Sequence, residues 1–209
     1  MGLPPELILK ARRHLSRRDP ALKQLIKTVG PFTLQPTGVS FVILVRAIIS
    51  QLISTKAAKT IYGRLEAAAP EGQVTAATLL GMDELTLRGF GLSGSKARGL
   101  RDLAERVATG ALPLDHLAEL SDEEVTARLL PVHCVGRWTT EMFLIFALGR
   151  LDVLPVDDLG LRAGVRDVYG FAELPDRKKL RELAEPWRPY RSVATWYFWR
   201  QRGGVPQSK

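Results

Sequence analysis

Apolar residues recur at helical spacing along most of the chain, and no segment shows the regular alternation of a β-strand. The clearest case runs from Phe41 to Leu52, where apolar residues occupy nearly every side of the predicted helix. A helix of this kind is typical of the centre of a domain, because no face of it suits water. The pattern therefore predicts an all-α fold, which we expect to form two helical lobes with a cleft.

Capping residues and helix breakers set the limits of the other predicted helices. Asp19 and Pro20 are typical of a helix start, Gly30 with Pro31 ends that helix, and Ser40 is a predicted N-cap. The predicted helices span residues 6–15, 21–29, 41–52, 55–68, 75–80, 82–87, 95–104, 121–129, 159–170, 175–185 and 190–202.

The stretch from Leu130 to Leu161 carries the candidate chemistry. It contains a short turn at Gly136, a helix that is apolar on almost every side, and an acid pair, Asp157 and Asp158, that begins another helix. The turn and the helix after it present unpaired backbone N–H groups at the positive end of a helix dipole. Phosphate oxygens of DNA fit such a site without sequence preference. The stretch therefore predicts a DNA-clamping hairpin followed by a functional carboxylate.

Charge favours the same kind of partner. Lys and Arg number 30 against 22 acids, which gives a net charge of +8 and an isoelectric point near 9.9. Such an excess is typical of proteins that bind nucleic acid, although a merely basic soluble protein is the alternative. The run A-R-R-H-L-S-R-R from Ala11 to Arg18 is interpreted as a solvated helix face, with DNA contact as its alternative.

Cysteine content and hydropathy exclude several classes of protein. The single cysteine, Cys134, excludes an internal disulfide and a Cys-ligated cluster. No segment is typical of a signal peptide, and the longest apolar run, broken by Arg46, is too short to cross a bilayer. We therefore expect a cytoplasmic, nucleoid-associated protein with no membrane partner.

The order of hairpin, buried helix and acid pair resembles the helix-hairpin-helix superfamily of base-excision DNA glycosylases. Within it, V-G-R-W-T-T-E-M-F-L-I-F followed by P-V-D-D-L-G-L-R is similar to the 3-methyladenine DNA glycosylase II (AlkA-type) branch. R-A-I-I-S-Q-L-I-S-T-K-A-A, G-L-S-G-S-K-A-R-G-L-R-D-L-A and P-W-R-P-Y-R-S-V-A-T-W-Y-F-W match the family's patterns in the same order. The resemblance spans residues 38–202 and implies the HhH-GPD glycosylase fold.

The resemblance also implies a domain organisation. Residues 1–209 are expected to form a single HhH-GPD glycosylase unit. Within it, residues 38–150, with the hairpin, form the central lobe, and residues 1–37 with 151–209 form the second. Because so few residues precede the central lobe, we expect no N-terminal β domain of the kind that bacterial members often carry. We expect a monomer.

The implied activity is hydrolysis of the N-glycosidic bond of alkylated bases, such as 3-methyladenine and 7-methylguanine, in double-stranded DNA. Asp158 matches the family's catalytic acid, although an Asp before a helix is otherwise read as an N-cap. Trp138 stands where the lyase members carry a nucleophilic Lys. Since tryptophan cannot form a Schiff base, the resemblance implies a monofunctional hydrolase that needs no cofactor.

The damaged base must leave the stack before its glycosidic bond can be reached. Gln51 and Leu52, on the helix that resembles the family's inserting helix, are the candidate DNA wedge, with core packing as the alternative for Leu52. The candidates for the base pocket are Trp138, Met142, Leu159 and Trp199. Aromatic faces hold cationic bases, and flexible apolar side chains suit several lesions, so we expect a broad substrate range.

The hairpin is expected to bind DNA phosphate through Val132, His133, Cys134, Val135, Gly136 and Arg137. Cys134 occupies the position of the family's first hairpin glycine, where a left-handed Cys costs on the order of 1–2 kcal/mol. Either the turn is reshaped or the protein bears this strain. In related folds the hairpin carbonyls bind a monovalent cation, and whether they do so here is left open.

Two other functions fit parts of the sequence. A non-catalytic DNA-damage-binding module would need only the charge and the hairpin. An oxidised-base glycosylase with lyase activity would need an amine nucleophile, which Trp138 does not supply.

Overall fold

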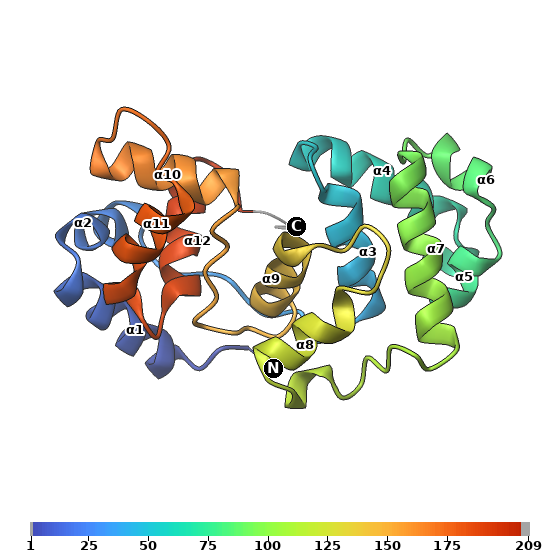
Figure 1. The fold of residues 1–209 in the computed structure, drawn as a ribbon, viewed down its shortest axis with the longest axis horizontal. Coiled ribbons are helices and arrows are strands. Elements are labelled where there is room, and N and C mark those ends of the chain that lie inside the picture. The colour runs from blue at the N-terminus through green and yellow to red at the C-terminus, as the bar shows by residue number, and fades with distance from the viewer. Residues whose placement is uncertain (1, 206–209) are drawn as a thin grey trace. The chain divides into compact units, whose positions relative to one another are not determined.

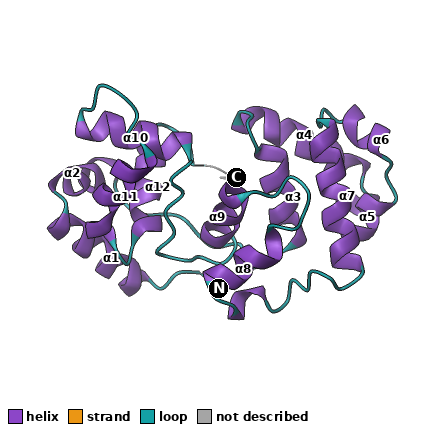
Figure 2. Cartoon of the chain, viewed as in Figure 1, coloured by secondary structure: helices purple, strands orange, loops and turns teal. Residues whose placement is uncertain are grey.

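The computed structural model describes residues 2–205, which form two compact units (Figure 1). Unit 1 comprises Met1–Gly38 with Leu144–Lys209, and unit 2 comprises Val39–Phe143. The described residues form helices and loops without a strand (Figure 2), so the predicted all-α fold is confirmed. Residues 144–150, assigned above to the central lobe, belong to unit 1, where Phe146 stacks on Trp199 and its carbonyl oxygen accepts a hydrogen bond from the Thr37 N–H.

Helices and 3-10 turns follow one another from the N-terminus to the C-terminus. Unit 1 contains α1 (Pro5–Arg18), α2 (Pro20–Val29), α10 (Leu159–Tyr169), α11 (Arg177–Ala184), η3 (Glu185–Trp187) and α12 (Arg191–Gln201). Unit 2 contains α3 (Phe41–Ser50), α4 (Thr55–Ala68), η1 (Pro70–Gly72), α5 (Ala76–Leu80), α6 (Glu84–Gly89), α7 (Gly94–Ala108), η2 (Leu117–Glu119) and α8 (Asp122–Leu129). The limit between the units falls inside α9 (Arg137–Phe146).

The predicted N-caps are present, but the C-terminal end of α3 differs from the prediction. The Ser40 hydroxyl accepts the Ile43 N–H, and Ser121 forms a capping box with Glu124. The apolar run to Leu52 predicted a helix of the same length, but α3 ends at Ser50. Helical spacing alone does not reveal this end, because Leu52 leaves the helix in a left-handed conformation with φ 55°.

Unit 1 is built around α12, whose residues from Ser192 to Trp199 are all buried. Asp19 links the surrounding helices. Its Oδ1 accepts the backbone N–H groups of Ala21 and Leu22 at the start of α2, and its Oδ2 accepts the hydroxyl of Tyr169 and the indole N–H of Trp187. Because this one carboxylate bonds to residues of α2, α10 and η3, it links these three elements to one another.

In unit 2 the hairpin packs tightly on α7. Gly99 lies on α7 where an added Cβ would overlap the Cys134 sulfur and lie 2.7 Å from the His133 carbonyl oxygen. A residue without a side chain is therefore required for the hairpin to approach α7 this closely. Among residues 2–205 no helix is long and apolar enough to cross a membrane.

We expect Gly99→Ala to destabilise the protein by about 1–3 kcal/mol, because either the hairpin or α7 must shift. Gly63→Ala is the matched control, since Gly63 also lies within a helix, α4, but an added Cβ would meet nothing within 4 Å. The control should be stabilised by about 1 kcal/mol through helix propensity. Urea denaturation measures both changes, and equal effects of the two substitutions would contradict the tight packing at Gly99.

Candidate functional site

Asp158 is the N-cap of α10, and only 6% of its surface is exposed. Its Oδ1 accepts two hydrogen bonds, one from the Leu161 backbone N–H at 2.6 Å and one from the Trp199 indole Nε1 at 2.7 Å. The N-terminus of α10 also favours a negative charge at this place. Asp158 is therefore an N-cap, and the same contacts hold its carboxylate in one orientation, as catalysis would require.

Trp199 has a role that its sequence pattern does not reveal. The indole is 1% exposed and stacks on Phe146, with ring centroids 5.6 Å apart. Gly160 leaves room for this ring, because a Cβ there would lie 3.1 Å from Asp158 Oδ1 and 3.2 Å from Trp199 Cδ1. Trp199 positions Asp158 directly, and its contribution to a base pocket stays a prediction.

The two acids of the predicted pair have different surroundings. Asp157 is exposed and forms an ion pair with the guanidinium of Arg177, whereas Asp158 is buried. A buried carboxylate interacts more strongly with nearby charge than one that faces water. This difference singles out Asp158 as the acid suited to stabilise a developing positive charge.

The loop that leads to Asp158 is fastened to the start of α12. Arg191 forms a bidentate ion pair with Asp152, with its Nε 2.7 Å from Oδ1 and its Nη2 3.0 Å from Oδ2. The Val153 N–H donates to the Ser192 hydroxyl at 2.9 Å. Because α12 also carries Trp199, this one helix holds both the loop that precedes Asp158 and the carboxylate of Asp158.

The turn between α3 and α4, residues 51–54, presents the predicted wedge. Leu52 is fully exposed, at 101% of its reference surface, so the core-packing alternative is wrong. It has a φ of 55°, which costs a residue with a Cβ about 1–2 kcal/mol. A strained and fully exposed apolar side chain gains nothing within the unit, which is typical of a functional position.

Gln51 does not project from the turn with Leu52. Its side-chain Nε2 donates to the Cys134 carbonyl oxygen and to the Thr139 hydroxyl, both at 2.9 Å. Lys96 Nζ donates to the carbonyl oxygens of Ile49 at 2.8 Å and Gln51 at 2.6 Å. We call Lys96 and Gln51 the wedge clasp, because they tie the turn to α7 and to the hairpin. Gln51 therefore supports the turn that presents Leu52, and its own part in the wedge stays a prediction.

The hairpin keeps its left-handed turn with a cysteine at its centre. Cys134 has a φ of 58°, so the strain is borne and the turn is not reshaped. Burial raises the pKa of the Cys134 thiol, which favours the neutral form. Burial lowers the pKa of the nearby Lys96 ammonium.

Several backbone N–H groups of the predicted phosphate site already donate hydrogen bonds to other residues of the chain. The His133 N–H donates to Asp102 Oδ2 at 2.6 Å, and the N–H groups of Val132 and Val135 donate to main-chain carbonyls. Among the described residues, the N–H groups of Cys134 and Gly136 donate to no other group. At the hairpin, the backbone N–H groups of Cys134 and Gly136 are therefore the ones left for a phosphate, and phosphate binding there stays a prediction.

Arg137 begins α9 and is exposed, with its Nε 3.1 Å from Glu141 Oε1. The His133 side chain is exposed and lies 3.5 Å from the Ser95 hydroxyl, so phosphate binding by its ring stays a prediction. Both positions leave a charged or polar side chain at the surface of the hairpin.

The remaining pocket candidates lie on both units. Trp138 is half-buried in the first turn of α9, and Met142, one turn later, is fully buried in unit 2. Leu159 follows Asp158 in unit 1 and is 62% exposed. The grouping of these residues into one base pocket stays a prediction. Within residues 2–205, no three or more His, Cys, Asp or Glu side chains are grouped closely enough to hold a metal ion.

A model of the family described as HhH-GPD superfamily base excision DNA repair protein matches residues 45–189. The matched segment includes the wedge turn, the hairpin and Asp158, and it spans more than half of the chain. The chain belongs to this superfamily.

Similar proteins place this superfamily member in the 3-methyladenine glycosylase branch. DNA-3-methyladenine glycosylase 1 of Schizosaccharomyces pombe is 36% identical over 198 residues, which cover 92% of this chain and 87% of that protein. The structure of the 3-methyladenine DNA glycosylase of S. pombe in complex with abasic DNA has a TM-score of 0.88 at 34% identity, covering 96% of this chain and all of that one. A DNA-3-methyladenine glycosidase from Bacillus halodurans has a TM-score of 0.77 at 35% identity, over 96% of this chain and 90% of its own.

We expect Lys96→Met to loosen the wedge turn, because hydrogen bonds from a charged donor contribute about 1.5–3 kcal/mol. Amide hydrogen exchange in a peptide that covers residues 50–54 should accelerate by about 10-fold or more. Lys59→Met, which removes an exposed lysine from α4 without a bond to this turn, is the control. Equal exchange rates in wild type and Lys96→Met would show that the ammonium does not hold the turn.

Proposed function

We propose that this chain is a monofunctional DNA glycosylase of base excision repair. It hydrolyses the N-glycosidic bond of alkylated bases, including 3-methyladenine and 7-methylguanine, that are flipped out of duplex DNA. The observation that carries the proposal is the buried carboxylate of Asp158, which Trp199 and the N-terminus of α10 hold in place. It acts as a monomer on chromosomal DNA in the cytoplasm.

Alkylation gives the purine a positive charge, so the base leaves with the electrons of the glycosidic bond without strong protonation. As this bond breaks, positive charge develops on the deoxyribose, and the Asp158 carboxylate stabilises it. Water then adds to the C1′ carbon and loses a proton, for which Asp158 is the candidate base. The products are the free base and an abasic site in an intact strand.

Hydrolysis without strand scission is supported by the residue at the start of α9. Trp138 lacks an amine, and an amine nucleophile is what forms the Schiff base of a lyase. The reaction requires no cofactor. Any monovalent cation at the hairpin would be held by main-chain carbonyl groups and would have a structural role.

DNA binding and base extrusion are assigned to unit 2 in this proposal. The free N–H groups of Cys134 and Gly136, with the exposed Arg137, suit a phosphate of the DNA backbone. Leu52 is already extended into solvent, so it can fill the gap that the flipped nucleotide leaves. Unstacking a nucleotide costs a few kcal/mol, and less for a damaged base that pairs poorly.

The decisive experiment compares wild type with Asp158→Asn on a duplex that contains 7-methylguanine. Wild type should release free base and leave the strand intact until alkali is added. The variant should release base at least about 100-fold more slowly, because the amide carries no charge to stabilise the deoxyribose. Strand scission by wild type without alkali would indicate a lyase, and binding without release from any alkylated base would leave a damage-binding module.

Leu52→Gly separates stability from function. Glycine adopts a positive φ without strain, and no packing is lost, so the variant should be as stable as wild type or up to about 1 kcal/mol more stable. Base release from duplex DNA should nevertheless slow by about 10-fold, because unstacking is no longer offset by the wedge.

Glu71→Gly is the matched control for the wedge. Glu71 also has a positive φ, 53°, and is exposed, but it lies in η1. This variant should gain the same stability and keep the wild-type rate of base release. A wild-type rate in Leu52→Gly would remove the wedge from the proposal.

A further inference from the structure

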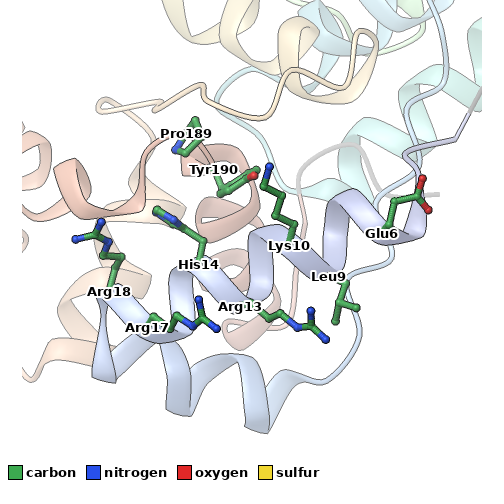
Figure 3. Close-up of a pocket in the computed structure, with 9 residues that line it drawn as sticks. All are labelled: Glu6, Leu9, Lys10, Arg13, His14, Arg17, Arg18, Pro189 and Tyr190. Carbon is green, nitrogen blue, oxygen red and sulfur yellow. The ribbon is translucent and has the colours of Figure 1, made fainter.

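A groove on unit 1 is lined by the basic face of α1. Lys10, Arg13, Arg17 and Arg18 project from successive turns of this helix, and Pro189 with Tyr190 lies across from them (Figure 3). The groove, which we call the α1 groove, encloses about 880 Å³. This space is far larger than one inorganic phosphate needs, and it suits a segment of a polymer.

The cations of the α1 groove are not neutralised by the protein. Within residues 2–205 none of the side chains of Lys10, Arg13, Arg17 and Arg18 forms an ion pair, and Glu6 is the single acid in the lining. Other arginines of unit 1 are neutralised by acids, as Arg188 and Arg191 are by Asp152. The groove therefore presents a concentrated positive potential to solvent.

The stability of α1 does not explain this clustering. Arg17 and Arg18 are in the last turn, where cations interact favourably with the helix dipole. Lys10 and Arg13 are in the middle of the helix, where this effect is absent. Like charges four residues apart, such as Arg13 and Arg17, destabilise a helix. This clustering of cations destabilises α1, so the physical benefit that remains is the binding of an anion.

The far wall of the groove is fixed. His14 Nε2 lies 3.2 Å from the Pro186 carbonyl oxygen, and the His14 ring packs edge-on against Tyr190 with centroids 5.4 Å apart. Within unit 1, α12 packs against both α1 and α10, and these two helices lie on opposite sides of the unit (Figure 1). The groove is thus a surface apart from the helix that begins at Asp158.

We infer that the α1 groove binds the sugar–phosphate backbone of duplex DNA, outside the lesion-binding site. The inference rests on the proposed function, which makes DNA the substrate. From Lys10 to Arg18 the helix rises by about 12 Å, which corresponds to roughly three to four nucleotides of one strand. Contacts of this kind read no sequence and hold the enzyme on undamaged DNA between lesions.

The test measures the affinity for undamaged duplex DNA as a function of salt for Arg13→Ala/Arg17→Ala. Each phosphate contact contributes about one unit to the slope of log affinity against log salt, so the slope should fall by about 2. Lys178→Ala/Arg181→Ala is the matched control, because it removes the same charge from exposed positions of α11. The control should keep a slope close to that of wild type.

Single-turnover base release at saturating enzyme distinguishes the groove from the lesion site. The Arg13→Ala/Arg17→Ala variant should release 7-methylguanine at the wild-type rate and melt at the wild-type temperature. Equal salt slopes for the groove variant and its control would overturn the inference, and so would a loss of base release in the groove variant alone. If wild type released no base, the proposed function would fail, while the salt slopes on undamaged DNA would still decide the role of the groove.

Discussion

The two hydrogen bonds to Oδ1 of Asp158 are the constraint on which the candidate active site depends. One donor belongs to the helix that Asp158 begins, and the other belongs to the buried helix α12. Gly160 leaves room for the indole of Trp199, and Arg191 fastens the preceding loop to the same helix. Asp19 in turn bonds to Tyr169 at the end of α10. The orientation of this carboxylate is therefore set by α10, by α12 and by the loop that α12 holds, as expected of a group that must be placed before the transition state forms.

Unit 2 contains backbone strain close to its candidate DNA-binding residues. Leu52 and Cys134 both have a positive φ, and each costs about 1–2 kcal/mol. Such conformations persist only where the surroundings fix them. Lys96 bonds to the backbone carbonyls of Ile49 and Gln51, which precede Leu52, and the Gln51 side chain bonds to the Cys134 carbonyl. The absence of a side chain at Gly99 lets the hairpin pack against α7. The strained turn holds the apolar side chain of Leu52 in water, which is the arrangement that the proposed DNA wedge requires.

Much of this structure could be predicted from the sequence, because capping and periodicity are local signals. Ser40, Asp19 and Ser121 mark helix starts that the structure confirms, and the family resemblance predicted Asp158 as the catalytic acid. The end of α3 could not be predicted, since Leu52 continues the apolar pattern while the backbone leaves the helix. Lys96 was equally hidden, because its partners are main-chain oxygens of Ile49 and Gln51, distant in sequence and without a residue signature. The indole of Trp199 was expected to face a base, and no sequence pattern shows where its N–H points.

Trp199→Phe is the most direct test of the claim that Asp158 is held for catalysis. Phenylalanine keeps an aromatic ring beside Phe146 but removes the indole N–H that bonds to Oδ1. Single-turnover release of 7-methylguanine should slow by at least about 10-fold, since a charge-assisted hydrogen bond contributes about 1.5–3 kcal/mol. The affinity for the same DNA should be unchanged. A wild-type rate would contradict the account, as would a loss of affinity that fully explained the slower reaction.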